Sequence, residues 1–220
     1  RYKKIFSCLD WRTVMAIEHN DWSLINLGKI IDVSDFVESP PWERGTFGYY
    51  RPGNVRYTPH EQIDPEIKEG WIQPRSSVNN SKALARWGHP KFKRTFIKIK
   101  KIVEEVLGEK IYPTYYYDRF YFKGCQLEKH VDRGACEISI SMHISTNATY
   151  DWPLYFQVND KVIPVSPKAG EAVLYKGIEF EHWRDPLEGD RNTYFHQIFF
   201  HYVRANGNYI EHAYDRCQST

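Results

Sequence analysis

The sequence predicts a mainly β protein with supporting helices, and the pattern of its second half is the main reason. Six short segments rich in β-branched and aromatic residues follow one another there, at 114–122, 136–145, 152–158, 161–167, 170–176 and 192–203. Turn residues separate the segments, at Lys123-Gly124, Asn159-Asp160, Lys168-Ala169-Gly170 and Glu188-Gly189-Asp190. Strands without intervening helices are typical of an antiparallel sandwich or barrel.

The first half predicts helices and loops. Apolar residues recur at helical spacing over residues 91–107, with Pro90 at the start and Gly108 just past the end. Lysines fill the other face of this helix, which we interpret as a solvated face. A shorter helix is expected over residues 9–18.

Length and composition indicate one globular domain. The 220 residues carry a net charge of +2, which does not favour nucleic acid as a partner. No apolar run approaches the roughly 20 residues that span a bilayer, so no membrane partner is expected. The four cysteines follow no disulfide or CxxC spacing, which indicates free thiols and a reducing, cytoplasmic location. Neither the length nor the composition of the sequence indicates an oligomeric state.

A His-x-Asp pair, His130 and Asp132, stands before a strand with two different faces. Its Ile138, Ile140, Met142 and Ile144 alternate with Ser139, Ser141 and His143. Two histidines and one carboxylate on one face, with other positions open, form the ligand set of non-haem Fe(II) oxygenases. The pair is therefore a candidate half of a metal site.

A third ligand must come from elsewhere in the chain. The candidates are His143, His182, His196, His201 and His212. His182 is preferred, because it lies at a strand margin beside a loop. His196 and His201 are five residues apart on one strand, so at most one of them can face inward.

An anion site is expected at Arg191, where the last strand begins, nine residues after His182. A buried arginine needs an anionic partner, and a guanidinium binds a carboxylate in bidentate fashion. A dicarboxylic co-substrate that reaches from the metal to this arginine would satisfy both ends.

Five segments in this order resemble the 2-oxoglutarate- and Fe(II)-dependent dioxygenases, closest to the prolyl 4-hydroxylase-like branch. They are Tyr-x-x-Gly at 121–124, HVD at 130–132, PKAGEAVLY at 167–175, EHWRDPLEG at 181–189 and QIFFHYV at 197–203. The resemblance implies a double-stranded β-helix, or jelly roll, at about 113–203. A helical and loop-rich part at about 1–112 would precede it, and a short tail would follow it.

The resemblance also implies the site residues. Fe(II) would be held by His130, Asp132 and His182, and 2-oxoglutarate would be bound by Arg191 with help from Tyr121. Prolyl 4-hydroxylases place a lysine ten residues after the second histidine, whereas this position is Asn192 here. Other branches place an arginine nine residues on, which matches Arg191, and Arg184 is the alternative. Four more residues are expected to line the co-substrate pocket: Ser141, His143, Thr193 and Gln197.

The implied activity is hydroxylation of an unactivated C–H bond, with consumption of O2 and 2-oxoglutarate and release of succinate and CO2. Related halogenases have a small residue in place of the carboxylate, so Asp132 favours hydroxylation. The substrate would be a peptidyl proline or another peptide side chain, an amino acid or a small metabolite. Alternatives are a nucleic-acid demethylase of the same superfamily and a non-catalytic jelly-roll binding module.

The substrate entrance is expected near residues 36–60, which are rich in proline, glycine and aromatic residues. Trp42 would provide contact area in a lid over the metal. Arg133 and Arg184 would add positive charge around the mouth. Packing of this loop away from the metal is the alternative.

Overall fold

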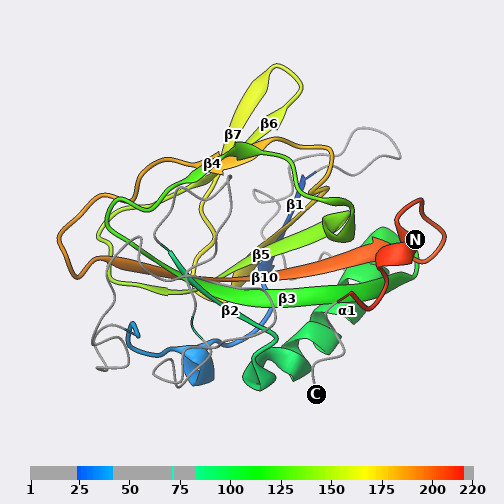
Figure 1. The fold of residues 1–220 in the computed structure, drawn as a ribbon, viewed down its shortest axis with the longest axis horizontal. Coiled ribbons are helices and arrows are strands. Elements are labelled where there is room, and N and C mark those ends of the chain that lie inside the picture. The colour runs from blue at the N-terminus through cyan, green and yellow to red at the C-terminus, as the bar shows by residue number, and fades with distance from the viewer. Residues whose placement is uncertain (1–23, 42–70, 72–82, 216–220) are drawn as a thin grey trace, which may run out of the picture.

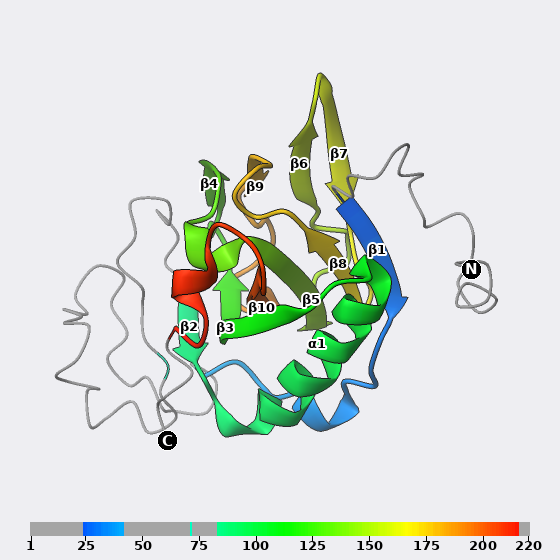
Figure 2. The same cartoon turned by 90° about the vertical axis from the view of Figure 1, so that its right-hand side faces the viewer.

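Two antiparallel β-sheets face one another in the computed structural model, which describes residues 24–41, 71 and 83–215 (Figures 1 and 2). The large sheet has the strand order β1-β8-β5-β10-β3-β2, and the small sheet has the order β4-β9-β6-β7. The large sheet comprises β1 (Leu24–Lys29), β2 (Leu84–Trp87), β3 (Ile111–Phe122), β5 (Ile138–Thr146), β8 (Glu171–Tyr175) and β10 (Tyr194–Arg204). The small sheet comprises β4 (Leu127–His130), β6 (Leu154–Val158), β7 (Lys161–Val165) and β9 (His182–Arg184).

The chain crosses repeatedly between the sheets from β3 onward. It alternates from β3 to β4 and β5, forms the projecting β6–β7 hairpin, and returns through β8 and β9 to β10 (Figure 2). Every strand pair in the described residues is antiparallel. This is a jelly roll, so the predicted fold class is confirmed.

A single α-helix within the described residues, α1 (Lys93–Leu107), covers the outer face of the large sheet (Figure 2). It follows a short 3-10 turn, Pro90–Phe92, and ends at Gly108, whose left-handed φ of 70° a glycine adopts without steric cost. Its buried side chains Phe96, Ile99 and Val103 are spaced three and four residues apart, as one helix face requires. The predicted helix is confirmed.

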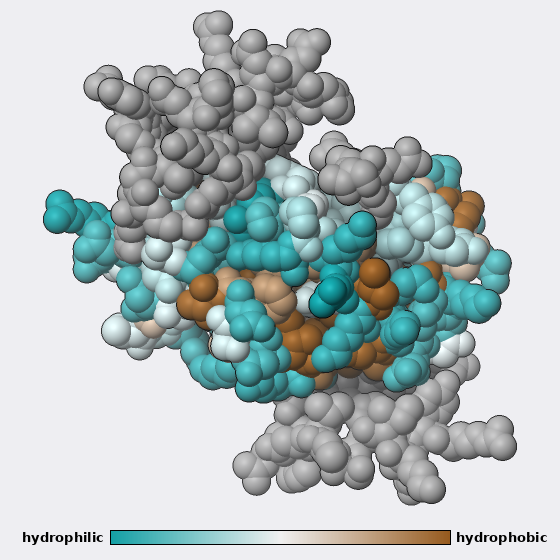
Figure 3. Space-filling model, turned by 90° about the horizontal axis from the view of Figure 1, so that it is seen from below, coloured by the Kyte–Doolittle hydropathy of each residue, from teal (hydrophilic) through white to brown (hydrophobic). Residues whose placement is uncertain are grey.

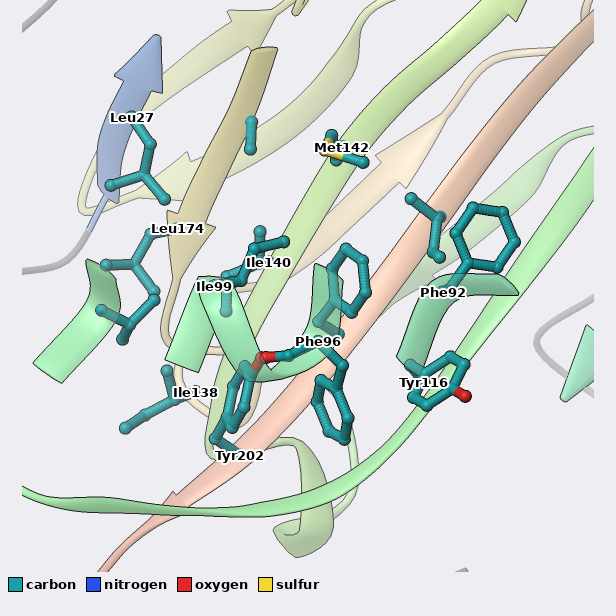
Figure 4. Packing of buried hydrophobic residues seen from close by; sticks show 14 of the residues in the cluster. Leu27, Phe92, Phe96, Ile99, Tyr116, Ile138, Ile140, Met142, Leu174 and Tyr202 are labelled. Atoms are coloured by element: carbon teal, nitrogen blue, oxygen red, sulfur yellow. The ribbon is translucent and has the colours of Figure 1, made fainter. Parts of the chain in front are cut away.

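The main hydrophobic core lies between α1 and the large sheet (Figure 4). The outer face of β5 contributes its four predicted apolar residues, Ile138, Ile140, Met142 and Ile144, all fully buried. The hydroxyl of Tyr202 on β10 donates to the Phe96 carbonyl at 2.8 Å, which ties the helix to the sheet. The serine-bearing face of β5 is therefore left for the space between the two sheets.

Four strands were not predicted from the sequence. Strands β1 and β2 lie in the first half of the chain, at positions where no strand was predicted, and they extend both edges of the large sheet. Strands β4 and β9 have four and three residues, too few for an alternation to be recognised. The helix predicted over residues 9–18 and most of the 36–60 segment lie outside the described residues.

The side of the molecule that carries α1 is mainly hydrophilic, with small hydrophobic patches between the polar side chains (Figure 3). On the helix, Lys93, Arg94, Lys98 and Lys101 are exposed, as the lysine-rich face predicted. No helix in the described part of the chain is long and apolar enough to cross a membrane.

Candidate metal and co-substrate site

The register of the small sheet brings the candidate ligands together. His130 is the last residue of β4 and pairs directly with His182, the first residue of β9. Asp132 follows two residues after His130, and its Oδ1 lies 3.6 Å from His130 Nε2 and 3.7 Å from His182 Nε2. Nitrogen and oxygen atoms of these three residues can therefore face one common point.

Backbone carbonyls orient both imidazole rings. The Nδ1 atom of His130 lies 2.7 Å from the Glu128 carbonyl, and that of His182 lies 2.9 Å from the Phe180 carbonyl. A histidine that ligates a metal characteristically donates its other ring N–H to such an acceptor, which fixes the tautomer and the ring orientation. Both Nε2 atoms are then unprotonated and available as ligands.

The protonation states also suit a divalent metal. Burial lowers the pKa of His182, although Asp132 acts in the opposite direction, so the ring is neutral at physiological pH. Burial alone would raise the pKa of Asp132, but interactions with His182 and His130 hold it below its usual value. Two imidazoles and one carboxylate on one side of a metal fit Fe(II), with the remaining positions open.

Gly177 makes room for Asp132 and was not identified from the sequence. Its carbonyl accepts the Asp132 backbone N–H at 2.8 Å. A Cβ atom at this position would lie 2.4 Å from Asp132 Oδ2 and 2.3 Å from the Cys136 carbonyl, closer than any real contact. A glycine directly after the β8 segment EAVLYK was the available signal in the sequence.

The inner face of the large sheet carries the predicted polar residues. Ser141 on β5 is fully buried and accepts a 2.7 Å hydrogen bond from Gln197 on β10. The ring of His143 lies 4.2 Å from that of Phe195, and burial together with Arg184 lowers the pKa of His143 to about 4. The two-faced character of β5 is therefore confirmed.

Arg184 is the arginine that the structure places in the interior. It is only 2% exposed, and its guanidinium carbon lies 4.5 Å from the ring centre of Trp152 and 5.1 Å from that of Phe195. Its Nη1 donates to the Trp152 carbonyl at 2.5 Å, whereas Nε and Nη2 have no hydrogen-bond partner in the described part of the chain. Burial lowers its pKa to about 10, opposed by Tyr121 and Tyr175.

Unpaired buried guanidinium donors are costly, so this arrangement indicates a position for an anion. Arg184 follows His182 by two residues on β9, so both side chains face the same side of the strand, about 7 Å apart along it. A five-carbon dicarboxylate can span this separation.

Arg191 lies elsewhere than predicted. It is exposed and stands in the turn before β10, which begins only at Tyr194. Thr193 is buried, but it bonds with Asp190 inside the same turn instead of lining the interior. The spacing from His182 matched the expected position of an anion-binding arginine, but the turn holds this part of the chain outside the sheets.

Two further arginines are Arg133, which was expected near the mouth, and Arg119, which was not identified from the sequence. Arg133 is exposed and pairs with Asp215 at 2.7 Å, with its guanidinium 4.9 Å from the centre of the Tyr115 ring. Arg184 is buried and therefore does not belong to the mouth. Arg119 was missed; it is buried on β3 and donates to the Tyr121 hydroxyl at 3.3 Å. Arg119 could have been identified from the strand periodicity, because Tyr117, Arg119 and Tyr121 alternate along β3 and therefore share one strand face. Trp42 lies outside the described residues.

His196 and His201 face opposite sides of β10, as predicted. His196 lies 3.0 Å from Asp118 in a cluster where Arg86 also bonds Asp118 and Glu38. Because Arg86 and Lys91 already pair with these two carboxylates, this cluster is a buried ion network rather than a metal site. His201 lies on the inner side, and burial lowers its pKa to about 4.

Comparisons with known proteins rest on structure. No protein-family model matches the chain, and no curated protein matches it. SnoN, a non-heme alpha-ketoglutarate-dependent epimerase from nogalamycin biosynthesis, is similar with a TM-score of 0.55 and 11% identity, over 83% of this chain and 78% of SnoN. AviO1 from Streptomyces viridochromogenes Tue57 has a TM-score of 0.54 and 12% identity, over 84% of this chain and 91% of AviO1.

A prolyl hydroxylase from Trichoplax adhaerens, solved with a peptide fragment of hypoxia inducible factor, has a TM-score of 0.50. It is 12% identical over 70% of this chain and 76% of its own. At these identities the likeness concerns the fold alone. The chain thus shares its jelly-roll fold with proteins that include an alpha-ketoglutarate-dependent epimerase and a prolyl hydroxylase.

Proposed function

We propose that this protein is an Fe(II)- and 2-oxoglutarate-dependent oxygenase that hydroxylates an unactivated C–H bond. One observation carries the proposal: His182 and Arg184 face the same interior from one short strand. The first completes a set of two histidines and one carboxylate, and the second offers two buried donors that have no partner among the described residues. The shared fold is consistent with this reaction class.

The chemistry of each side chain suggests its role in the proposed reaction. Fe(II) would be held by His130 Nε2, Asp132 Oδ1 and His182 Nε2. When bound, iron and 2-oxoglutarate together with O2 supply the oxidising chemistry, with succinate and CO2 as co-products. Arg184 would bind the distal carboxylate through Nε and Nη2, in a charge-assisted pair that is strong in a dry interior.

The surrounding side chains would exclude water and orient the co-substrate. The Arg184 guanidinium contacts the rings of both Trp152 and Phe195, which pack edge to face against each other, and these contacts limit its movement. Tyr121 is fully buried and packs against Trp152 with ring centroids 5.0 Å apart, and its hydroxyl is the expected second partner of the carboxylate. Gln197 and Ser141 would line the wall opposite the small sheet.

Anaerobic titration tests the proposal. Addition of Fe(II) and then 2-oxoglutarate to the purified protein should produce a visible charge-transfer absorption band that neither component gives alone. Exposed Arg191 provides the matched control, because Arg191→Ala should leave the band unchanged while Arg184→Ala weakens it. Absence of the band from the wild type would contradict the proposal and favour a non-catalytic binding module.

The substrate can be identified by measuring succinate release in the presence of each candidate. The candidates are prolyl peptides, other peptides, amino acids, small metabolites and methylated nucleotides. Stimulation by a prolyl peptide would support the prolyl 4-hydroxylase-like branch, and stimulation by a methylated nucleotide would support the demethylase alternative. Mass analysis of the product distinguishes hydroxylation, which adds one oxygen atom, from epimerisation, which leaves the mass unchanged. The second outcome would replace hydroxylation by the reaction of SnoN.

A further inference from the structure

The Ser139 hydroxyl on β5 lies among four polar groups: the Asp132 carboxylate, the His201 ring, the Cys136 carbonyl and the Tyr175 hydroxyl. Its Oγ is 3.1 Å from Asp132 Oδ2, 2.9 Å from His201 Nδ1 and 3.0 Å from the Cys136 carbonyl. Ser139 is fully buried and His201 is 2% exposed, so both side chains are shielded from water, whereas Asp132 is partly exposed. The two oxygen atoms of Asp132 are thereby distinguished, because Oδ1 faces the two histidines and Oδ2 faces Ser139.

This network is not itself a second metal site. Asp132, Cys136 and His201 offer ligand atoms within 4.8 Å of one another, as a metal would require. However, the Ser139 hydroxyl already bridges Asp132 and His201. The Cys136 sulfur lies 3.0 Å from the Tyr115 hydroxyl, and burial raises the pKa of this thiol, which disfavours the thiolate that a metal needs.

The available donors and acceptors favour one placement of the Ser139 hydroxyl proton and the His201 ring proton. The Ser139 hydroxyl has one proton, and the Asp132 carboxylate, being charged, is a stronger acceptor than the Cys136 carbonyl. If Ser139 donates to Asp132, its oxygen must accept the Nδ1–H of His201. His201 Nε2, which has no hydrogen-bond partner within the described residues, is then an unprotonated acceptor. The other tautomer would bury an N–H donor without an acceptor and leave Asp132 Oδ2 without its bond, at a greater cost.

We propose that Ser139 and His201 are positioning residues that hold Asp132 as a one-oxygen metal ligand. The relay runs from His201 Nδ1–H to Ser139 Oγ, and from Ser139 Oγ–H to Asp132 Oδ2. With Oδ2 held in this way, only Oδ1 is directed toward the metal, and the position that a second carboxylate oxygen would occupy is left for the co-substrate. This inference rests on the proposed metal site and assigns to it two residues that touch neither metal nor substrate.

Metal affinity, measured without turnover, tests the relay. Apo protein is titrated calorimetrically with Co(II), an air-stable stand-in for Fe(II), in the wild type and in Ser139→Ala. Loss of a partner that orients a ligand typically lowers metal affinity by about 10- to 100-fold, and we expect this range for Ser139→Ala. Ser145→Ala is the matched control, because Ser145 lies farther along β5 and its Oγ has no hydrogen-bond partner in the described part of the chain.

A pair of substitutions at His201 separates hydrogen bonding from packing. Asn and Leu are similar in size and leave similar cavities, but only Asn carries an N–H donor near the position of Nδ1. We expect His201→Asn to retain affinity within a few-fold of wild type and His201→Leu to lose about as much as Ser139→Ala. Circular dichroism of each apo variant verifies that the fold is intact.

The outcomes are distinct. Equal losses in the Asn and Leu variants, or wild-type Co(II) affinity in Ser139→Ala, would overturn the relay while leaving the metal site in place. Failure of the wild type itself to bind Co(II) or Fe(II) would instead overturn the proposed function.

Discussion

His182 and Arg184 lie two residues apart on β9, and both are almost completely buried on the inner side of the small sheet. His182 Nε2 approaches Asp132, whereas the Arg184 guanidinium contacts the rings of Trp152 and Phe195. One three-residue strand thus sets the distance between the proposed metal ligand and the proposed anion anchor. Backbone geometry fixes that distance, so the two ends of the co-substrate site cannot move independently.

Replacement of Arg184 should affect the co-substrate specifically. Arg184→Leu removes the buried guanidinium, and loss of one partner of a desolvated charge pair costs about 2–5 kcal/mol. We expect the apparent KM for 2-oxoglutarate to rise by about 30-fold or more. Co(II) affinity should stay near wild type, and Arg191→Leu should alter neither quantity. An unchanged KM in Arg184→Leu would transfer the role to another cation, with Arg119 the next to examine.

Removal of a proposed ligand should abolish metal binding without unfolding the protein. His182→Ala and Asp132→Ala should each show little Fe(II) binding in anaerobic titration and no succinate release. His196→Ala, on the opposite side of the large sheet, should bind Fe(II) normally even if its thermal stability is reduced by damage to the Asp118 network. The reverse pattern for the two histidine variants would show that the ligand set is wrong.

The apo protein should lose stability as the pH falls below neutrality. Burial depresses the pKa of both His143 and His201 from 6.5 to about 4, so between these values the unfolded state binds protons that the native state does not. The free energy of unfolding therefore decreases as the pH is lowered from 6.5 to 4, by up to about 3 kcal/mol for each ring. Above pH 6.5 both states are neutral and these rings add no pH dependence.

Denaturant titrations at a series of pH values measure this slope. His143→Phe removes one titrating ring but keeps an aromatic side chain beside Phe195, so its unfolding free energy should fall less steeply between pH 6.5 and 4. A slope equal to that of the wild type would show that His143 is not buried in its neutral form.

Gly177→Ala should weaken metal binding through Asp132. The added Cβ would lie 2.4 Å from Asp132 Oδ2 and 2.6 Å from Ser139 Oγ, so the carboxylate must shift. We expect Co(II) affinity to fall by about 10-fold or more, in line with disturbance of an outer ligand partner. In Gly207→Ala, the comparison variant, the Cβ meets Arg204 and Glu137 side chains instead, so stability should fall while Co(II) affinity is retained.

The sequence predicted the longer strands and the helix, because only long elements show a clear periodicity of apolar residues. Strands β5 and β10 have 9 and 11 residues, and α1 has 15, so alternation and helical spacing were both clear. The edge strands β1 and β2 were missed because tertiary pairing with β8 and β3, not a strong local pattern, stabilises them.

The site residues that stand in a sequence motif could be predicted. Those whose role depends on whether the side chain is buried could not. His130, Asp132 and His182 stand in recognisable segments, and the register between β4 and β9 brings them together. Arg184 and Arg191 are both plausible anion partners by spacing, and only the turn at 190–193 shows that Arg191 remains outside. The contact of Ser139 with both Asp132 and His201 depends on three-dimensional packing across 62 residues of sequence, which no local pattern records.

The antiparallel pairing of β4 with β9 also bears on when the protein can acquire its metal. The two histidines are separated by the whole of β5, the β6–β7 hairpin and β8, all of which are synthesised before His182 emerges. A nascent chain that ends before β9 has at most two of the three ligands, and the intervening loop must close before they can meet. Loading of the proposed metal would therefore be a late step in the biogenesis of this protein, and C-terminal truncations before residue 182 should accumulate as metal-free chains.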